Sequence, residues 1–291
     1  MKRFVKIYTY WLLGILLFTG CDDYLKEDSG DLLIPGKVEE FLPMLYREGF
    51  PRNFNDEVAW LYLMTDDVEM GQLELDPEDE ANDTRDKNSS DAFNVGEGEE
   101  PYKWEREIKS YADNFWERRY GNILACNLVI DALPEMEYVE ADSGNYNFLA
   151  AQAYALRAYN YWCLVNSYAL PWSKENLDKP GVIIRMEPQI NISPRGRSSI
   201  REVYDLINED IEKAEKYINI ATFDGNIHRL SEPAILLLAS RIALFQENWD
   251  EVIRTGKLFL AQNSVILNLN DQDTTLFGTE KGLSNKIFTM M

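Results

Sequence analysis

Apolar residues recur every three or four positions between residues 200 and 218, and charged residues fill most of the positions between them. This spacing places the apolar side chains on one stripe of an α-helix, so it predicts an amphipathic helix over that range. Ser199 precedes the stripe and Glu202 follows three residues later, which is the arrangement of a capping box at a helix N-terminus. The residues predicted to face the core are Ile200, Val203, Tyr204, Ile207, Ile211, Ala214 and Ile218.

Two further helical patterns predict a helix hairpin. The first covers residues 231–246, with Ser231 as its N-cap and Pro233 in its first turn, where a missing N–H costs nothing. Only two residues separate it from the second, at 249–262, so the two helices must pack antiparallel. The hairpin resembles a tetratricopeptide unit. Its apolar stripes are Ile235, Leu238, Ile242 and Phe245 in the first helix, and Trp249, Val252, Ile253, Gly256 and Phe259 in the second.

Another pair of helices is predicted upstream, at residues 113–136 and 147–168. The second of them is apolar on most faces, which indicates a buried helix. Because one helical repeat cannot bury its own faces, these patterns favour a mainly α fold: a stacked, tetratricopeptide-like scaffold of antiparallel helix hairpins with long irregular loops. Residues 167–196 contain four prolines and predict such a loop, with a short strand at Val182–Arg185.

The first twenty residues have the pattern of an export signal. Three basic residues precede an apolar run over residues 8–18, which is too short to span a bilayer of about 30 Å. Phe18-Thr19-Gly20-Cys21 resembles the lipobox of bacterial lipoproteins, in which the cysteine is acylated and becomes the new N-terminus. An ordinary signal peptide followed by an incidental cysteine is the alternative. We expect residues 1–20 to be a lipoprotein signal peptide and Cys21 to carry lipid.

Charge narrows the set of partners. The chain has 50 acidic and 29 basic residues and a formal net charge of −21. Phosphate contacts need clustered Lys and Arg, so nucleic acid is excluded as a partner. A basic patch cannot hold such a chain on anionic lipid, so membrane attachment must come from the acyl group.

Few residues of the sequence are suited to catalysis or to metal binding. Cys126 and Cys163 lie in apolar helical patterns and are predicted to be buried thiols, with a disulfide between them left open, and His228 is the only histidine. Residues 66–100 are rich in Asp, Glu, Asn and Ser, but they contain no calcium-loop spacing, so we expect an acidic surface loop without metal. The sequence predicts no cofactor and no catalytic residue.

Several segments in the same order resemble the SusD/RagB family of surface lipoproteins of Bacteroidota. Each motif is weak alone, but their order from Cys21 to Leu260 is specific. The segments are "CDDYLKED" (21–28), "KVEEFLPMLYREGF" (37–50), "YLMTDDVEM" (62–70), "NILACNLVIDALPEM" (122–136), "AQAYALRAYNYWCLVNSYALPW" (151–172), "RGRSSIREVYDLINEDIEKAEKYI" (195–218) and "RLSEPAILLLASRIALFQENWDEVI" (229–253).

The resemblance implies a non-enzymatic, surface-exposed outer membrane lipoprotein. Such a protein binds a nutrient, here a glycan, and delivers it to a partner TonB-dependent, SusC-like transporter. Sugar capture needs aromatic platforms and polar groups for the hydroxyls. In this family ligand contacts come largely from loops, and our candidates on or just after the acidic loop are Asp67, Tyr102 and Trp104. Packing of the two aromatic residues against the scaffold is the alternative.

The resemblance also implies a domain plan. We expect residues 21–291 to form a SusD-like helical domain, made of an N-terminal segment with the acidic loop (21–109), the helical repeats (110–262) and the start of a truncated C-terminal part (263–291). Two other functions stay open. One is a secreted acidic glycoside hydrolase with a carboxylate pair, for which Asp66 and Asp67 are the nearest candidates. The other is a helical-repeat lipoprotein that binds protein and carries no nutrient.

Overall fold

The computed structural model describes residues 36–51, 64, 100–106, 114–136, 138, 140–190, 193–223, 225–226 and 228–263. Cys21, Asp66, Asp67 and the signal sequence lie outside these residues. The chain divides into two compact units, Met1–Gly36 and Lys37–Met291, and the helices below belong to the second. They are α2 (Val38–Glu48), α6 (Phe115–Ala132), the short 3₁₀ turns η2 (Leu133–Glu135) and η3 (Glu140–Asp142), α7 (Ser143–Tyr168), α8 (Ile200–Ile218), α9 (Glu232–Phe245) and α10 (Trp249–Gln262).

Helix α8 begins at the predicted capping box. The Ser199 side chain accepts a hydrogen bond from the Glu202 backbone N–H, and the Glu202 carboxylate accepts one from the Ser199 N–H at 2.7 Å. Every residue of the predicted stripe is buried. The prediction is confirmed because the cap determines where the helix starts, and the 3.6-residue period then determines which face meets the core.

Replacing Ser199 by alanine is expected to lower the free energy of unfolding by about 1 kcal/mol, because one first-turn N–H of α8 loses its acceptor. Urea unfolding followed by circular dichroism measures this. Ser198→Ala is the control, since the hydrogen bonds described for Ser198 come from its backbone. Equal losses for the two variants would contradict the capping role.

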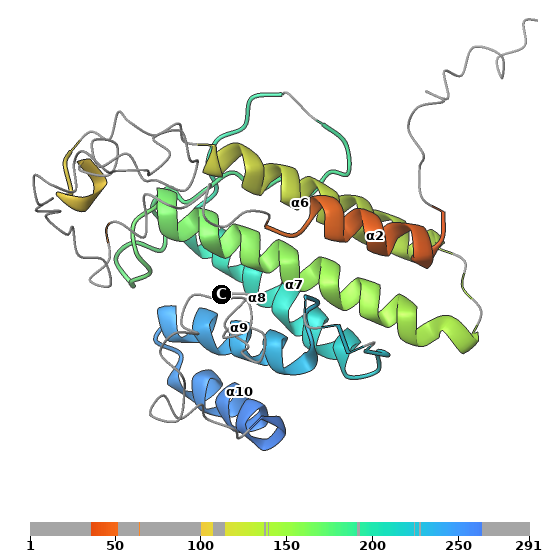
Figure 1. Ribbon diagram of the computed structural model, residues 1–291. Helices are drawn as coiled ribbons and strands as arrows, with labels where there is room; N and C mark the ends of the chain where they lie inside the picture. The colour runs from red at the N-terminus through yellow and green to blue at the C-terminus, as the bar shows by residue number, and fades with distance from the viewer. Residues whose placement is uncertain are drawn as a thin grey trace, which may run out of the picture. The chain divides into compact units, whose positions relative to one another are not determined.

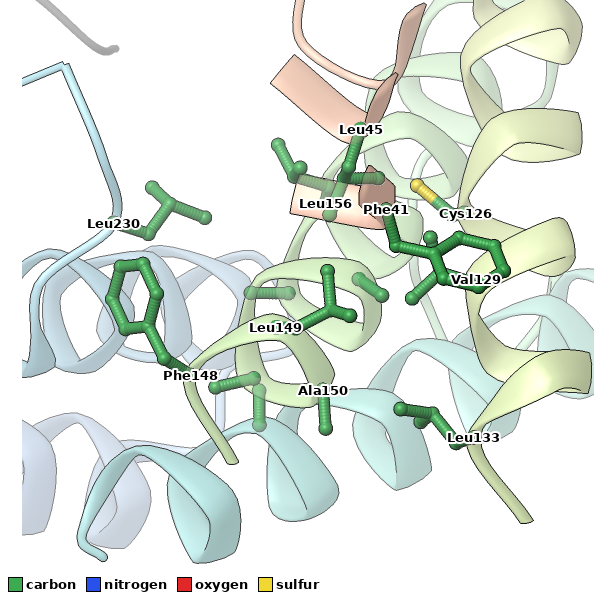
Figure 2. Packing of buried hydrophobic residues seen from close by; sticks show 14 of the residues in the cluster. Phe41, Leu45, Cys126, Val129, Leu133, Phe148, Leu149, Ala150, Leu156 and Leu230 are labelled. Atoms are coloured by element: carbon green, nitrogen blue, oxygen red, sulfur yellow. The ribbon is translucent and has the colours of Figure 1, made fainter. Parts of the chain in front are cut away.

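Helix α7 is the centre of the scaffold. It packs against α6 on one side and α8 on the other, and α2 lies along α6 (Figure 1). Fifteen of its residues are buried, so the prediction of a helix buried on most faces is confirmed. One buried cluster joins α2, α6 and the first half of α7 and includes Phe41, Leu45, Cys126, Val129 and Leu149 (Figure 2). A second joins the latter half of α7 to α8 and α9.

Helices α9 and α10 form the predicted hairpin, but part of the predicted apolar stripe of α10 is exposed. Thr255 is its only buried residue, whereas Trp249 and Ile253 are 58% and 53% exposed. Phe245, at the end of α9, is also 45% exposed. The reason is that α9 is the described helix on which α10 mainly packs, so a large part of the surface of α10 is left uncovered by the described helices. Within the described ranges, no helix is long and apolar enough to cross a membrane.

The strand predicted at Val182–Arg185 is also wrong. The described part of the chain contains no β-strand, and its only ladder element is an isolated antiparallel bridge between Pro180 and Ser199. Gly181 donates to the Ser198 carbonyl and Ser198 donates to the Val182 carbonyl, at 2.7 and 3.0 Å. Beyond Val182, side chains of the helices make the hydrogen bonds to the backbone that a neighbouring strand would otherwise make. The stretch of β-branched residues therefore forms an extended segment with no sheet among the described residues.

Candidate functional site

Tyr102 lies in a helical stretch at residues 100–102, and Trp104 lies in the turn that follows it. Trp104 donates its backbone N–H to the Pro101 carbonyl at 3.0 Å and adopts the left-handed region with φ of 55°. Its indole is 68% exposed, while Tyr102 is half-buried. Trp104 is therefore largely accessible to solvent, and its role in binding stays a prediction. Asp67 lies outside the described residues, so nothing in the structure brings it to this turn.

A pocket of about 470 Å³ lies elsewhere, between α6 and the segment of residues 183–190. We call it the α6 pocket. Its wall on the helix side combines aromatic and aliphatic side chains, and its wall on the segment side carries most of the polar ones. The lining residues are Trp116, Glu117, Tyr120, Gly121, Ile123, Leu124 and Asn127 from α6, and Ile183, Arg185, Glu187, Gln189 and Ile190 from the segment.

Three helical side chains hold the backbone of the segment. The Tyr120 hydroxyl donates to the Ile183 carbonyl at 2.7 Å. The Tyr161 hydroxyl donates to the Arg185 carbonyl at 2.7 Å and accepts from the Arg185 N–H at 2.8 Å. The amide of Asn127 donates to the carbonyls of Arg185 and Glu187 at 3.0 and 3.3 Å. These side chains take the place of a neighbouring strand, so the pocket wall is already formed without ligand.

The aromatic end of the pocket is tightly packed. The rings of Trp116 and Tyr120 lie 5.0 Å apart, and Tyr168 meets Trp116 edge to face at 4.9 Å. The guanidinium of Arg197 lies 5.6 Å from the Trp116 ring centre, within the range of a cation–π contact. These contacts hold the half-buried indole in one orientation, which pre-organises an apolar surface beside the polar wall.

The polar wall carries charge. Arg195 forms an ion pair with Oε1 of Glu187, and this hydrogen bond lowers the pKa of the Glu187 carboxyl. The second oxygen, Oε2, is inaccessible to solvent and has no hydrogen-bond partner among the described residues. Burial raises the pKa of Tyr120 to about 12, so its phenol remains a donor at neutral pH. The pocket wall thus places an ionised carboxylate, paired with Arg195, next to an apolar surface.

A second hollow of about 650 Å³ lies between α2 and α6. It shares Glu117, Gly121 and Leu124 with the α6 pocket, so the outer face of α6 borders both. The hollow is lined by apolar, polar and charged side chains. Among the described hydrogen bonds, none fixes its wall as those of Asn127 fix the wall of the α6 pocket.

The described residues do not assemble a nucleophilic or metal centre. His228 is exposed on a loop, and burial raises the pKa of the Cys126 thiol to about 12, which keeps it protonated. Cys126 is buried as predicted and Cys163 is half-buried, and no disulfide joins them. No group of three His, Cys, Asp or Glu side chains in the described ranges could hold a metal ion. The geometry of the α6 pocket is suited to non-covalent binding.

Sequence reasoning missed the α6 pocket. Its lining comes from two segments about sixty residues apart, and nothing in the spacing of either one indicates that they meet. A partial signal was the β-type stretch at Val182–Arg185, which indicated extended backbone in the middle of a helical chain. Its tyrosine and asparagine partners lie on helices, where they look like ordinary core and face residues.

Comparison with known proteins gives one consistent result. Residues 50–244 match the SusD-like family described as starch-binding and associating with the outer membrane. SusD-like protein P38 of Formosa agariphila is 27% identical over 158 residues, which are 53% of this chain and 27% of that protein. The crystal structure of a SusD-like carbohydrate-binding protein from Bacteroides vulgatus has a TM-score of 0.58 and 19% identity, covering 81% of this chain and 47% of that one.

A laminarin-binding SusD-like protein has a TM-score of 0.52 and 19% identity, covering 77% of this chain and 42% of that one. At these identities the structural likeness establishes a shared fold, and it confirms the mainly α, tetratricopeptide-like hairpin scaffold. This chain spans 27% of the length of the curated relative and less than half of the length of the two solved structures.

Proposed function

This chain belongs to the SusD-like family, and from that premise we propose that it binds a glycan and delivers it to a TonB-dependent, SusC-like transporter of the outer membrane. In this proposal residues 1–20 are removed and Cys21 carries the lipid that attaches the domain to the cell surface. Residues 21–291 then act as a binding module, with no cofactor and no catalytic step. The observation that carries the proposal is the family match over residues 50–244.

The α6 pocket supports a ligand-binding role. Trp116 supplies a fixed aromatic surface on which a sugar ring can stack, and the ion pair of Glu187 with Arg195 supplies a charged, polar wall beside it. The exposed indole of Trp104 is a second platform on which a sugar can stack. Asp67 and Tyr102 stay candidates of the same kind. Laminarin and starch are the first ligands to test, because they are named for a structural neighbour and for the family.

The test of the proposal is co-purification of the tagged full-length chain from its native outer membrane, with mass spectrometry of its partners and of its N-terminal peptide. The proposal expects a TonB-dependent barrel and an acylated Cys21. The Cys21→Ser variant is the control and is expected to lose the acyl group and its place in the membrane. An acylated protein without a barrel would overturn the delivery role and favour the protein-binding lipoprotein if another envelope protein co-purifies.

Glu187→Gln is expected to weaken glycan binding about tenfold, because the ion pair with Arg195 in the pocket wall is replaced by a hydrogen bond to a neutral amide of the same shape. Affinity electrophoresis of the full chain in gels containing laminarin or starch measures the change. Glu175→Gln is the matched control, since Glu175 is exposed and does not line the pocket. Equal retardation of both variants would remove Glu187 from the site.

The same preparation tests the glycosidase alternative. Release of reducing ends from laminarin or starch, abolished by Asp66→Asn or Asp67→Asn, would replace the binding role with hydrolysis. Retardation in the gel without release of reducing ends is the result that we expect.

A further inference from the structure

A continuous chain of buried polar groups runs from α8 through α7 to α6. Arg157 forms a two-point ion pair with Asp210, with Nε to Oδ2 at 2.8 Å and Nη2 to Oδ1 at 2.7 Å. The remaining Nη1 of Arg157 donates to Oδ1 of Asn127 at 2.9 Å. The three side chains are almost completely inaccessible to solvent, with Asp210 at 0%, Asn127 at 1% and Arg157 at 2% exposed.

Such an arrangement is a costly way to fill a helical core. Two charges removed from water lose their hydration, and well-packed apolar residues of the same volume often serve stability as well or better. What the ion pair provides, and apolar residues cannot, is a set of hydrogen-bond donors with fixed directions, because a guanidinium presents its N–H groups in a rigid planar fork. With Nε–H and one N–H of Nη2 on Asp210, the plane of the fork is fixed and so are the directions of the N–H groups of Nη1, one of which Asn127 accepts.

The guanidinium thereby determines which way the Asn127 amide points. Its oxygen must accept from Arg157, so its NH₂ group must face the opposite side. On that side lie the carbonyls of Arg185 and Glu187, at 3.0 and 3.3 Å from the amide nitrogen. These two residues supply the charged side chains on the segment side of the α6 pocket. The ion pair in the core is thus connected to the pocket wall by a single side chain.

We propose that Asn127 is a positioning residue of the ligand site, and that the buried Asp210–Arg157 pair orients it so that it holds the backbone of residues 185–187 in the binding geometry. Asn127 itself need not touch ligand. The inference rests on the proposed function for its effect on binding, but its effect on the segment is a property of the protein without ligand. The two can therefore be measured separately.

The test is Asn127→Asp. A carboxylate there still accepts from Arg157 but has no donor for the two carbonyls, so the connection is cut on the pocket side alone. Asn160→Asp is the matched control. Asn160 is fully buried, accepts from Arg119 at 3.1 Å and donates to the Leu156 carbonyl of its own helix at 2.8 Å. Both variants place a new carboxylate beside an arginine in the core, but only the first affects the pocket segment.

Amide hydrogen exchange of the full chain without ligand is the first measurement. We expect the peptide spanning residues 182–190 to exchange about tenfold faster in Asn127→Asp than in Asn160→Asp, while the α7 peptides behave alike in both. Affinity electrophoresis in laminarin or starch gels is the second, with about tenfold weaker binding expected for Asn127→Asp. Equal exchange of the 182–190 peptide in both variants would overturn the inference.

Arg157→Lys decides the matter if Asn127→Asp does not fold. Lysine keeps the charge opposite Asp210 but lacks the planar fork, so it cannot orient Asn127 in the same way. Faster exchange at 182–190 than in Asn160→Asp supports the inference, and unchanged exchange overturns it. If the unmodified protein binds neither glycan, the proposed function loses its support while the exchange result still decides the role of Asn127.

Discussion

Replacing Asp210 by alanine is expected to lower the free energy of unfolding by about 3–5 kcal/mol, because the buried guanidinium of Arg157 loses its counter-charge. The carboxylate and the guanidinium are 0% and 2% exposed, so water cannot replace the missing partner. Asn127 and the ring of Tyr154, 5.7 Å away, are neutral and cannot balance the charge. Since a typical domain is stable by about 5–15 kcal/mol, this single change removes a large part of the total.

Urea unfolding followed by circular dichroism measures the loss at Asp210. Asp178→Ala is the control, because it removes the carboxylate of an exposed ion pair with Arg201, and such pairs contribute about 0–1 kcal/mol. The double variant Arg157→Met with Asp210→Leu is expected to cost less than the two single changes together, since it leaves no unpaired charge. A loss for Asp210→Ala no larger than that for Asp178→Ala would contradict the structural role of the pair.

Leu149→Ala is expected to cost about 2–5 kcal/mol, because it opens a cavity where helices from distant parts of the chain meet. Leu149 is fully buried on α7 and belongs to the cluster that includes Phe41 and Leu45 of α2 and Val129 of α6 (Figure 2). Helices fixed by their own hydrogen bonds cannot move in far enough to fill the space, so the lost contacts are not recovered.

The same unfolding assay tests the core prediction, with Leu258→Ala as its control. Leu258 lies on α10 and is 44% exposed, so its loss is expected to cost less than about 1 kcal/mol. Both variants replace leucine by alanine, so the difference between the two losses of unfolding free energy reflects the different burial of the two side chains. Similar losses at both positions would mean that α10 is covered in solution, and that the exposure of its apolar stripe is not a property of the whole protein.

The positions of helices α7 and α8, and the faces that they bury, were predictable from the apolar pattern of the sequence. The stripe of α8 and the continuous apolar character of α7 both indicated burial, and both helices are buried as predicted. The stripe of α10 gave the same kind of signal, yet Trp249 and Ile253 are exposed. A periodic pattern shows that a helix has an apolar face, but it does not show which element covers that face.

The ligand candidates divide in a similar way. Trp104 was accessible to sequence reasoning because it follows an acidic loop, and its exposed ring agrees with a platform role without establishing it. The α6 pocket was not accessible, because Asn127 and Tyr161 look like residues of helical faces. What makes them functional candidates is the set of backbone atoms that they hold, and those atoms belong to a segment far along the chain.

By itself the sequence determined the family, the helical scaffold and the capped start of α8, because these depend on local period, local capping and the order of motifs. The tertiary structure alone decided that Val182–Arg185 has no strand partner among the described residues, that part of the apolar stripe of α10 is exposed, and that Asp210, Arg157 and Asn127 form one buried chain ending at a pocket. The physical reason is that a helix is closed by hydrogen bonds four residues apart, whereas burial and the pairing of charges depend on which distant segments meet.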